Sequence, residues 1–172
     1  MTLPAIFHSL EDADVEYAEF EFLDVDDSDD QIEAWFDGKV PQDMRFTVFA
    51  MDATGGLYAI WQRNDETIDD APVVLLGSEG EGVAIAKNGQ SFLEAMSSGL
   101  GISPFDGQWY DELEHVEEEE DEFIEEMERR QRFQTWFKEQ TDVHVARKPN
   151  EISQMVVPLT KTLNAVIESI FS

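Results

Sequence analysis

Short apolar runs closed by turn residues occupy the middle of the chain, and they restrict the fold more than any other feature. Between Phe46 and Met96 each run ends at a Gly, Pro, Asn or Asp residue. This punctuation is typical of antiparallel strands joined by tight turns, and it is not typical of helices. The sequence therefore predicts a meander, with strands at residues 44–51, 57–63, 73–76 and 83–86.

The side-chain pattern within two of these strands predicts how the sheet is covered. Val73–Leu76 is apolar at every position, which indicates an interior strand buried on both faces. Pro72 is able to begin this strand but not to lie inside it. In the first strand, period-two alternation predicts two distinct faces. One face is formed by Met44, Phe46, Val48 and Ala50, and the other by Arg45, Thr47, Phe49 and Met51.

A strand and a helix are expected before the meander. Residues 15–23 alternate between apolar and polar types, which indicates a half-buried strand with its glutamates outward. Ser28 is expected to cap the helix that follows, because serine is a preferred residue at that position. The apolar residues Ile32, Trp35 and Phe36 are expected to face the core from this helix.

A short helix and a loop are expected directly after the meander. Asn88 is a suitable cap for a helix that ends at Gly99, a residue that readily takes positive φ. The segment after Gly99 contains Pro104 and Gly107 and is predicted to be a loop over residues 100–110. The apolar anchors of this loop are expected to be Phe105, Trp109 and Tyr110.

The C-terminal third is helical in composition. Residues 111–140 are predicted to be helix with a break near 129–132, because the apolar stripe of the first part leads onto Arg130. Asn150 is then expected to cap a short helix that runs to Val157. Pro158 is expected to open the last helix, because proline is tolerated in a first turn. An apolar stripe would pack this last helix on the core through Leu159, Leu163, Val166, Ile167 and Ile170.

These elements predict one α+β domain over residues 1–172. It consists of an antiparallel meander of about 4–6 strands flanked by N- and C-terminal α-helices, with an acidic helical insertion around residues 111–128. A chain of 172 residues is long enough to bury about 70% of the surface that its unfolded form exposes. The hydrophobic fraction of 42% favours a folded core over disorder despite the charge.

The residue patterns that would indicate an active site or a metal centre are incomplete. The chain has no cysteine, and its three histidines are widely separated. Glu112 and His115 have the spacing of a di-iron ligand pair, but such a site needs two of these motifs. Residues 24–30 resemble the start of a calcium loop, but Asp29 and Trp35 stand where glycine and glutamate are required. We therefore expect no enzymatic activity, no cofactor and no metal site.

The net charge of −28 is the strongest compositional signal. Carboxylates in this excess repel the phosphates of nucleic acids and anionic membranes, so binding to either by direct attraction is not expected. The same charge favours a basic partner, although it also serves solubility. The sequence lacks both a basic N-terminal region before an apolar stretch and a long apolar run. A cytoplasmic location without a membrane span is therefore expected.

An ordered set of motifs resembles the SUKH superfamily. The set begins with a GG-x-Y-x-x-W segment at Gly55–Trp61, followed by PVVLLGSEGE at Pro72–Glu81. A helix carrying Phe92-Leu93 and a later FxxW segment at Phe133–Trp136 complete it. The resemblance covers about half of the chain. The acidic stretch Asp111–Glu122 is not part of the family pattern. The superfamily contains many bacterial immunity proteins and fungal cell-wall assembly regulators.

The resemblance and the acidic charge together predict a non-enzymatic binding protein. The first hypothesis is an immunity protein that neutralises a basic, nuclease-type toxin. The alternatives are a regulatory scaffold that recruits basic proteins and an acidic DNA mimic. The predicted partner-binding residues are exposed rings and acids, because Trp and Tyr anchor interfaces and carboxylates attract basic proteins. They are Trp109, Tyr110, Asp111, Glu112, Glu117, Glu118, Glu119, Glu120, Asp121, Glu122, Asp26, Asp27, Asp29, Asp30, Glu79 and Glu81.

Overall fold

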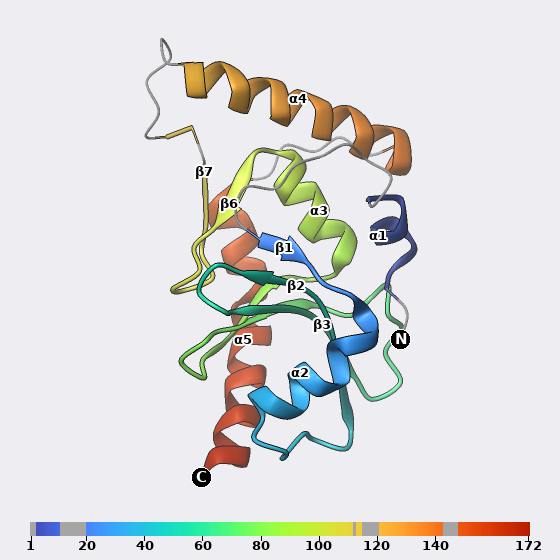
Figure 1. Ribbon diagram of the computed structural model, residues 1–172, viewed down its shortest axis with the longest axis vertical. Coiled ribbons are helices and arrows are strands. Elements are labelled where there is room, and N and C mark those ends of the chain that lie inside the picture. Colours follow the sequence, from blue (N-terminus) through green and yellow to red (C-terminus); the bar gives the residue numbers. More distant parts are fainter. Residues whose placement is uncertain (1–2, 11–19, 112, 115–120, 143–147) are drawn as a thin grey trace.

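A computed structural model describes residues 3–10, 20–111, 113–114, 121–142 and 148–172 (Figure 1). Its elements, in chain order, are α1 (Ala5–Leu10), β1 (Phe20–Phe22), a 3-10 turn (Val25–Asp27), α2 (Ser28–Trp35), β2 (Met44–Asp52), β3 (Leu57–Arg63), β4 (Val73–Leu76), β5 (Gly82–Ala86), α3 (Gly89–Ser97), β6 (Leu100–Ile102), β7 (Trp109–Asp111), α4 (Asp121–Thr141) and α5 (Pro149–Phe171).

The first five strands form one antiparallel sheet in the order β1-β2-β3-β4-β5, so each strand pairs with its neighbour in sequence. Within it, β3 and β4 pair with Ala59 opposite Val74. β6 and β7 form a separate antiparallel pair. This arrangement confirms the predicted α+β meander with helices toward both ends of the chain. Among the described residues, no helix is both long and apolar enough to cross a membrane.

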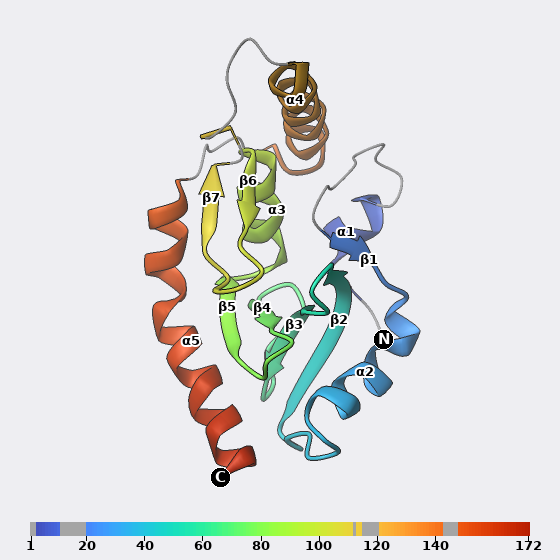
Figure 2. The same ribbon diagram turned by 60° about the vertical axis from the view of Figure 1, so that its left-hand side comes forward.

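Two buried clusters lie on opposite faces of the five-stranded sheet. In β4, Val73 and Leu75 belong to one cluster and Val74 and Leu76 to the other, which confirms a strand buried on both faces. Helices α1 and α3 cover the first face, with α4 packed against α3, and α2 and most of α5 cover the second face (Figure 2). The absence of a side chain at Gly82 lets α5 approach β5 closely, because a Cβ there would lie 2.4 Å from Ile167 Cδ1.

A β-bulge in β2 changes which side chains face each cluster. The pairing of β2 with β3 shifts register between Val48 and Ala50. As a result Phe49 and Ala50 pack in the same cluster, whereas Met51 packs against the one that contains Val48. The predicted alternation is therefore wrong at Ala50 and Met51, because a bulge inserts one extra residue and reverses the parity of the strand beyond it.

Ser28 does not cap α2. The residue at the cap position is Asp27, and its side chain makes no capping hydrogen bond. The hydroxyl of Ser28 is buried instead and accepts a hydrogen bond from Val48 N at 2.7 Å. It thereby satisfies a backbone donor at the start of the bulge and ties α2 to β2. The helix after the meander matches its prediction, since Asn88 Oδ1 accepts from Ser91 N at 2.9 Å and Gly99 has a φ of 76°.

The segment predicted to be a loop at residues 100–110 is a short hairpin, β6–β7. Ser103 N donates to Gln108 O at 2.9 Å, and the turn between the strands contains Phe105. Phe105 is 81% exposed, so it does not anchor the segment. The prediction failed because each strand contains only three residues, too few for a readable alternation.

Both C-terminal helices continue through the positions where a break or a new start is predicted. The predicted acidic helical insertion around residues 111–128 is wrong at its start, because Asp111 belongs to strand β7 and residues 113–114 form a turn. Helix α4 begins at Asp121 and runs without a break through residues 129–132. Arg130 lies on the side of α4 that faces the rest of the fold. A charged residue is tolerated there because its guanidinium donates to Gly99 O at 2.7 Å and to Asp111 Oδ1 at 2.5 Å. Helix α5 begins at Pro149 and continues through Pro158. Neither the predicted break in α4 nor the predicted helix start at Pro158 is present.

Candidate protein-binding surface

The chain around α2 exposes a dense set of carboxylates. No Lys or Arg precedes Lys39 in the sequence, so this part of the chain supplies no permanently cationic side chain. None of these acids forms an ion pair among the residues that the structure describes. We call this set the α2 acidic surface. Its exposed members are Glu21, Asp24, Asp26, Asp27, Asp29, Asp30, Glu33 and Asp37.

The local sequence holds this surface in a defined shape. Asp24 Oδ1 accepts from Asp26 N at 3.0 Å and so caps the 3-10 turn that leads into α2. Asp29 and Asp30 lie in the first turn of α2, where negative charge is favoured by the helix dipole. Ile32 is buried against the sheet. The acids are therefore carried by an element that the core holds in place.

The turn between β4 and β5 adjoins α2. The indole N–H of Trp35 donates to Gly77 O at 2.9 Å, which links the last turn of the helix to this loop. Gly77 N donates to Glu81 O at 2.8 Å, and Gly80 has a φ of 91°, so the chain reverses tightly between them. Glu79 is exposed. Of the predicted binding residues, Glu79 and Glu81 therefore lie at the same end of the molecule as the acids of α2.

Asp111, another predicted binding residue, is half-exposed and is paired with groups of the same chain. It lies in β7 and accepts hydrogen bonds from Arg130 Nη2 at 2.5 Å and from Leu113 N at 3.0 Å. Burial acts to raise the pKa of Asp111, but these two hydrogen bonds and the positive charge of Arg130 outweigh it and hold the pKa below the ordinary value of 3.8. This carboxylate therefore connects the β6–β7 hairpin to α4.

Of the remaining acids in the predicted C-terminal cluster, only Asp121 has a side chain that the structure describes. Asp121 is exposed and begins α4. Glu112 and Glu117–Glu120 lie outside the described residues, and only the backbone of Glu122 is described. Both views place α4 and α2 toward opposite ends of the long axis (Figures 1 and 2). The predicted acids whose side chains are described thus do not converge on one surface.

Trp109 was predicted to be an exposed aromatic residue, and this is wrong. Its side chain is only 4% exposed, and the indole N–H donates to Ile85 O at 2.8 Å. Its ring lies 5.8 Å from that of Phe92, within the core between the hairpin and α3. Tyr110, the next residue in β7, is partly buried. Among the described residues, the exposed aromatic rings belong to Phe22, Phe105 and Phe171.

The sequence predictions, which include the acids from Asp24 to Asp30 as candidate contacts, omit Glu21, Glu33 and Asp37 from the α2 acidic surface. A usable signal was the lack of any Lys or Arg before Lys39. Within the described part of the chain, no group of three or more His, Cys, Asp or Glu side chains is arranged to hold a metal ion. The carboxylates of α2 are spread over a convex helix and turn, an arrangement suited to contacts with several separate cationic groups.

Comparison with models of known protein families, with curated proteins and with solved structures finds no match to this chain.

Proposed function

We propose that this protein is a binding module that engages a basic protein through the α2 acidic surface. The observation that carries the proposal is the set of exposed carboxylates around a helix held by the core, with no ion pair to any described residue. Unpaired charge on a rigid element is available to a partner without first breaking an internal contact. It also requires little ordering when the complex forms.

A large net negative charge mainly affects the rate at which the protein associates with a basic partner. A net charge of −28 attracts a basic protein over several ångströms, and such steering raises association rates by about 10–10³-fold. The attraction weakens as salt shortens the Debye length. A basic nuclease is a suitable partner because its phosphate-binding site is cationic. Binding there would block the substrate directly.

The partner that we propose is a toxin domain, which makes this chain an immunity protein. The support for this narrower statement is the SUKH-like order of motifs between Gly55 and Trp136 together with the acidic surface. A scaffold for basic cellular proteins would use the same surface. It differs in its partner, which would not be toxic.

The proposal is tested by co-expressing the protein with the product of the adjacent upstream gene. We expect the neighbour to be toxic alone and harmless beside this protein, and the two to form a complex at low salt. A neighbour that is harmless alone, or that stays toxic in the presence of this protein, contradicts the immunity role. Competition of the protein with DNA for several unrelated DNA-binding proteins would favour a DNA mimic instead.

A matched pair of charge variants tests the surface itself. In the first, Asp26→Asn, Asp29→Asn, Asp30→Asn and Glu33→Gln are combined. In the second, Asp121→Asn, Glu125→Gln, Glu128→Gln and Glu139→Gln remove the same charge from exposed positions on α4. We expect the first variant to lower the association rate with the partner by at least about tenfold, and the second to have a much smaller effect. Equal losses would show that net charge alone matters, and that α2 is not the binding site.

A further inference from the structure

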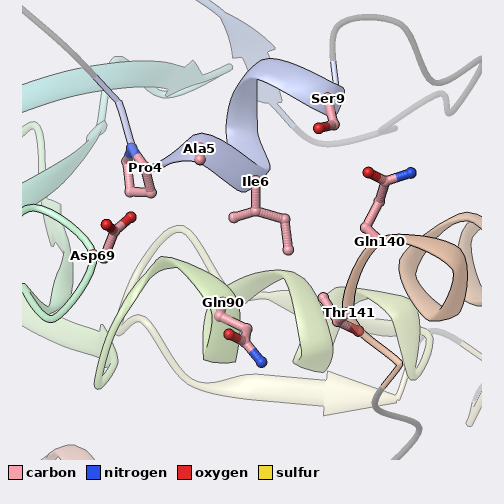
Figure 3. A pocket seen from close by; sticks show the side chains of 8 residues that line it. All are labelled: Pro4, Ala5, Ile6, Ser9, Asp69, Gln90, Gln140 and Thr141. Carbon is pink, nitrogen blue, oxygen red and sulfur yellow. The ribbon is translucent and has the colours of Figure 1, made fainter.

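A hollow of about 470 Å³ lies between α1, the start of α3, the end of α4 and the loop that precedes β4 (Figure 3). This volume is within the range of small-ligand pockets. The described residues that line it are Pro4, Ala5, Ile6, Ser9, Asp69, Gln90, Gln140 and Thr141. They come from four segments that are far apart in the sequence, so no local motif indicates this site.

The lining is polar at both ends, and between them the apolar side chain of Ile6 lies across from Gln90. Figure 3 places Asp69 beside Pro4 at one end, Ser9 and Gln140 at the other, and Ile6 between them. The side chains of Ser9, Asp69 and Gln140 form no hydrogen bond with any other described residue. Within the described part of the chain, these polar groups therefore do not link the surrounding elements to one another.

The charge of the hollow selects the class of ligand. Asp69 is the only charged side chain among the described residues that line it. A carboxylate with no Lys or Arg among the described residues that line the hollow with it repels anions, and the net charge of −28 adds to that repulsion. A cation with an apolar stem fits the lining better than an anion or a wholly apolar group does.

We propose that this hollow receives an arginine side chain of the basic partner. In this arrangement the guanidinium meets the carboxylate of Asp69, and the methylene stem lies over Ile6 and Pro4. The backbone peptide of the arginine meets Ser9 and Gln140, whose hydroxyl and amide groups both donate and accept hydrogen bonds. The identity of the arginine's source rests on the proposed function, whereas the chemistry of the hollow does not.

Arginine is preferred over lysine for two physical reasons. Its planar guanidinium presents a fork of N–H donors that matches a carboxylate in a bidentate way, whereas an ammonium acts as a point charge. The guanidinium is also more weakly hydrated, so transferring it from water into a partly enclosed site costs less.

The experiment uses the full chain and a defined probe, N-acetyl-arginine N-methylamide, followed by amide NMR. We expect saturable shifts of the side-chain amide signals of Gln90 and Gln140. The citrulline counterpart has nearly the same shape without the charge, and it should bind at least about fivefold more weakly. Equal binding of the two probes would overturn the inference, because the site would then recognise a neutral amide. No binding of the arginine probe would overturn it as well.

Two variants locate the contact. Asp69→Asn should weaken arginine binding at least about fivefold, and Asp65→Asn should leave it within about twofold. Asp65 is a matched control because it is exposed in the same loop and does not line the hollow. Equal weakening by both variants would mean that the probe senses general charge, which contradicts a defined site.

Failure of this inference is distinguishable from failure of the proposed function. If the arginine probe does not bind while the partner still depends on α2, the hollow is not an arginine site and the binding role stands. If the probe binds as expected but no basic protein forms a complex, the hollow is supported and the proposed function fails.

Discussion

Arg130 connects three parts of the molecule through one side chain. Its guanidinium donates to the carbonyl oxygen of Gly99 and to the carboxylate of Asp111, and it forms an ion pair with Glu126 at 3.4 Å. Gly99 leaves room for this approach, because a Cβ there would lie 2.1 Å from Arg130 Nε. The residue that suggested a helix break is therefore a principal contact between α4 and the rest of the fold.

At this scale we predict that Arg130→Gln raises the pKa of Asp111. The substitution removes a charged donor and its positive field, while the burial that acts to raise the pKa remains. In the parent protein the folded-state pKa is below 3.8, so the stability from this pair is complete above that pH and is lost as pH falls through the lower folded value. The pKa of Asp111 in the parent protein and in the variant is measured by following the chemical shift of its carboxyl carbon against pH by NMR. An unchanged pKa in the variant would show that Arg130 does not control this carboxylate.

Sequence reasoning at the level of single residues identified charge better than exposure. Asp26, Asp27, Asp29 and Asp30 are exposed acids, as an acidic stretch before a helix indicates. Trp109 is buried, although its neighbours in sequence are polar. Its exposure depends on α3 and β5, which reach it from distant parts of the chain.

Helix α5 and strand β5 illustrate how elements are held together. β5 is the last strand of the five-stranded sheet, so one of its edges has no partner strand. Helix α5 lies along β5 through the buried side chains of Leu163 and Ile167. Thr160 Oγ1 accepts from Ala84 N at 3.1 Å and so satisfies a backbone donor of this edge strand.

We predict that Thr160→Val lowers the free energy of unfolding by about 1–3 kcal/mol. Valine keeps the shape of the side chain but leaves the Ala84 N–H without its acceptor in a partly buried place. Thr162→Val is the control, since the Thr162 hydroxyl is exposed and donates only to Pro158 O in its own helix. Urea denaturation measures the free energy of unfolding of the parent protein and of the two variants. Equal stability of the two variants would mean that the contact with β5 contributes little.

Elements with a strong local signal were predictable, and those decided by distant contacts were not. The strands from β2 to β5 follow from alternation and turn residues, and α3 follows from its Asn88 cap. The continuity of α5 through Pro158 does not follow from the sequence, because a proline inside a helix costs about 3 kcal/mol. Packing of Val156 on one side of Pro158 and Leu163 on the other against the same cluster offsets that cost.

The whole molecule carries far more negative than positive charge. Ion pairs among the described residues involve Arg63, Arg129 and Arg130, and they leave the α2 acidic surface unpaired. Mutual repulsion among unpaired carboxylates destabilises the compact state, because folding brings them closer together. The same repulsion supplies the field that attracts a basic partner.

At this scale we predict that salt stabilises the folded protein. Raising NaCl from about 0.01 M to about 0.5 M shortens the Debye length from about 30 Å to below 10 Å and screens the repulsion, so the midpoint of thermal unfolding should rise. KCl at equal ionic strength should have the same effect, since screening does not depend on which monovalent cation is present. A midpoint that falls with salt would show that attractive ion pairs outweigh the repulsion.

The sequence by itself determined the antiparallel meander, the doubly buried strand β4 and the acidic character of α2. These features depend on residues that are close together in the chain. Alternation, turn residues and charge are local patterns, so the sequence is sufficient to predict them. Only the tertiary structure decided the bulge that reverses β2 after Val48, the burial of Trp109 and the pairing of Asp111 with Arg130. It also decided that α1, α3, α4 and the loop before β4 enclose a hollow. Each of these depends on groups that are distant in sequence, and a contact between such groups exists only once packing has brought them together.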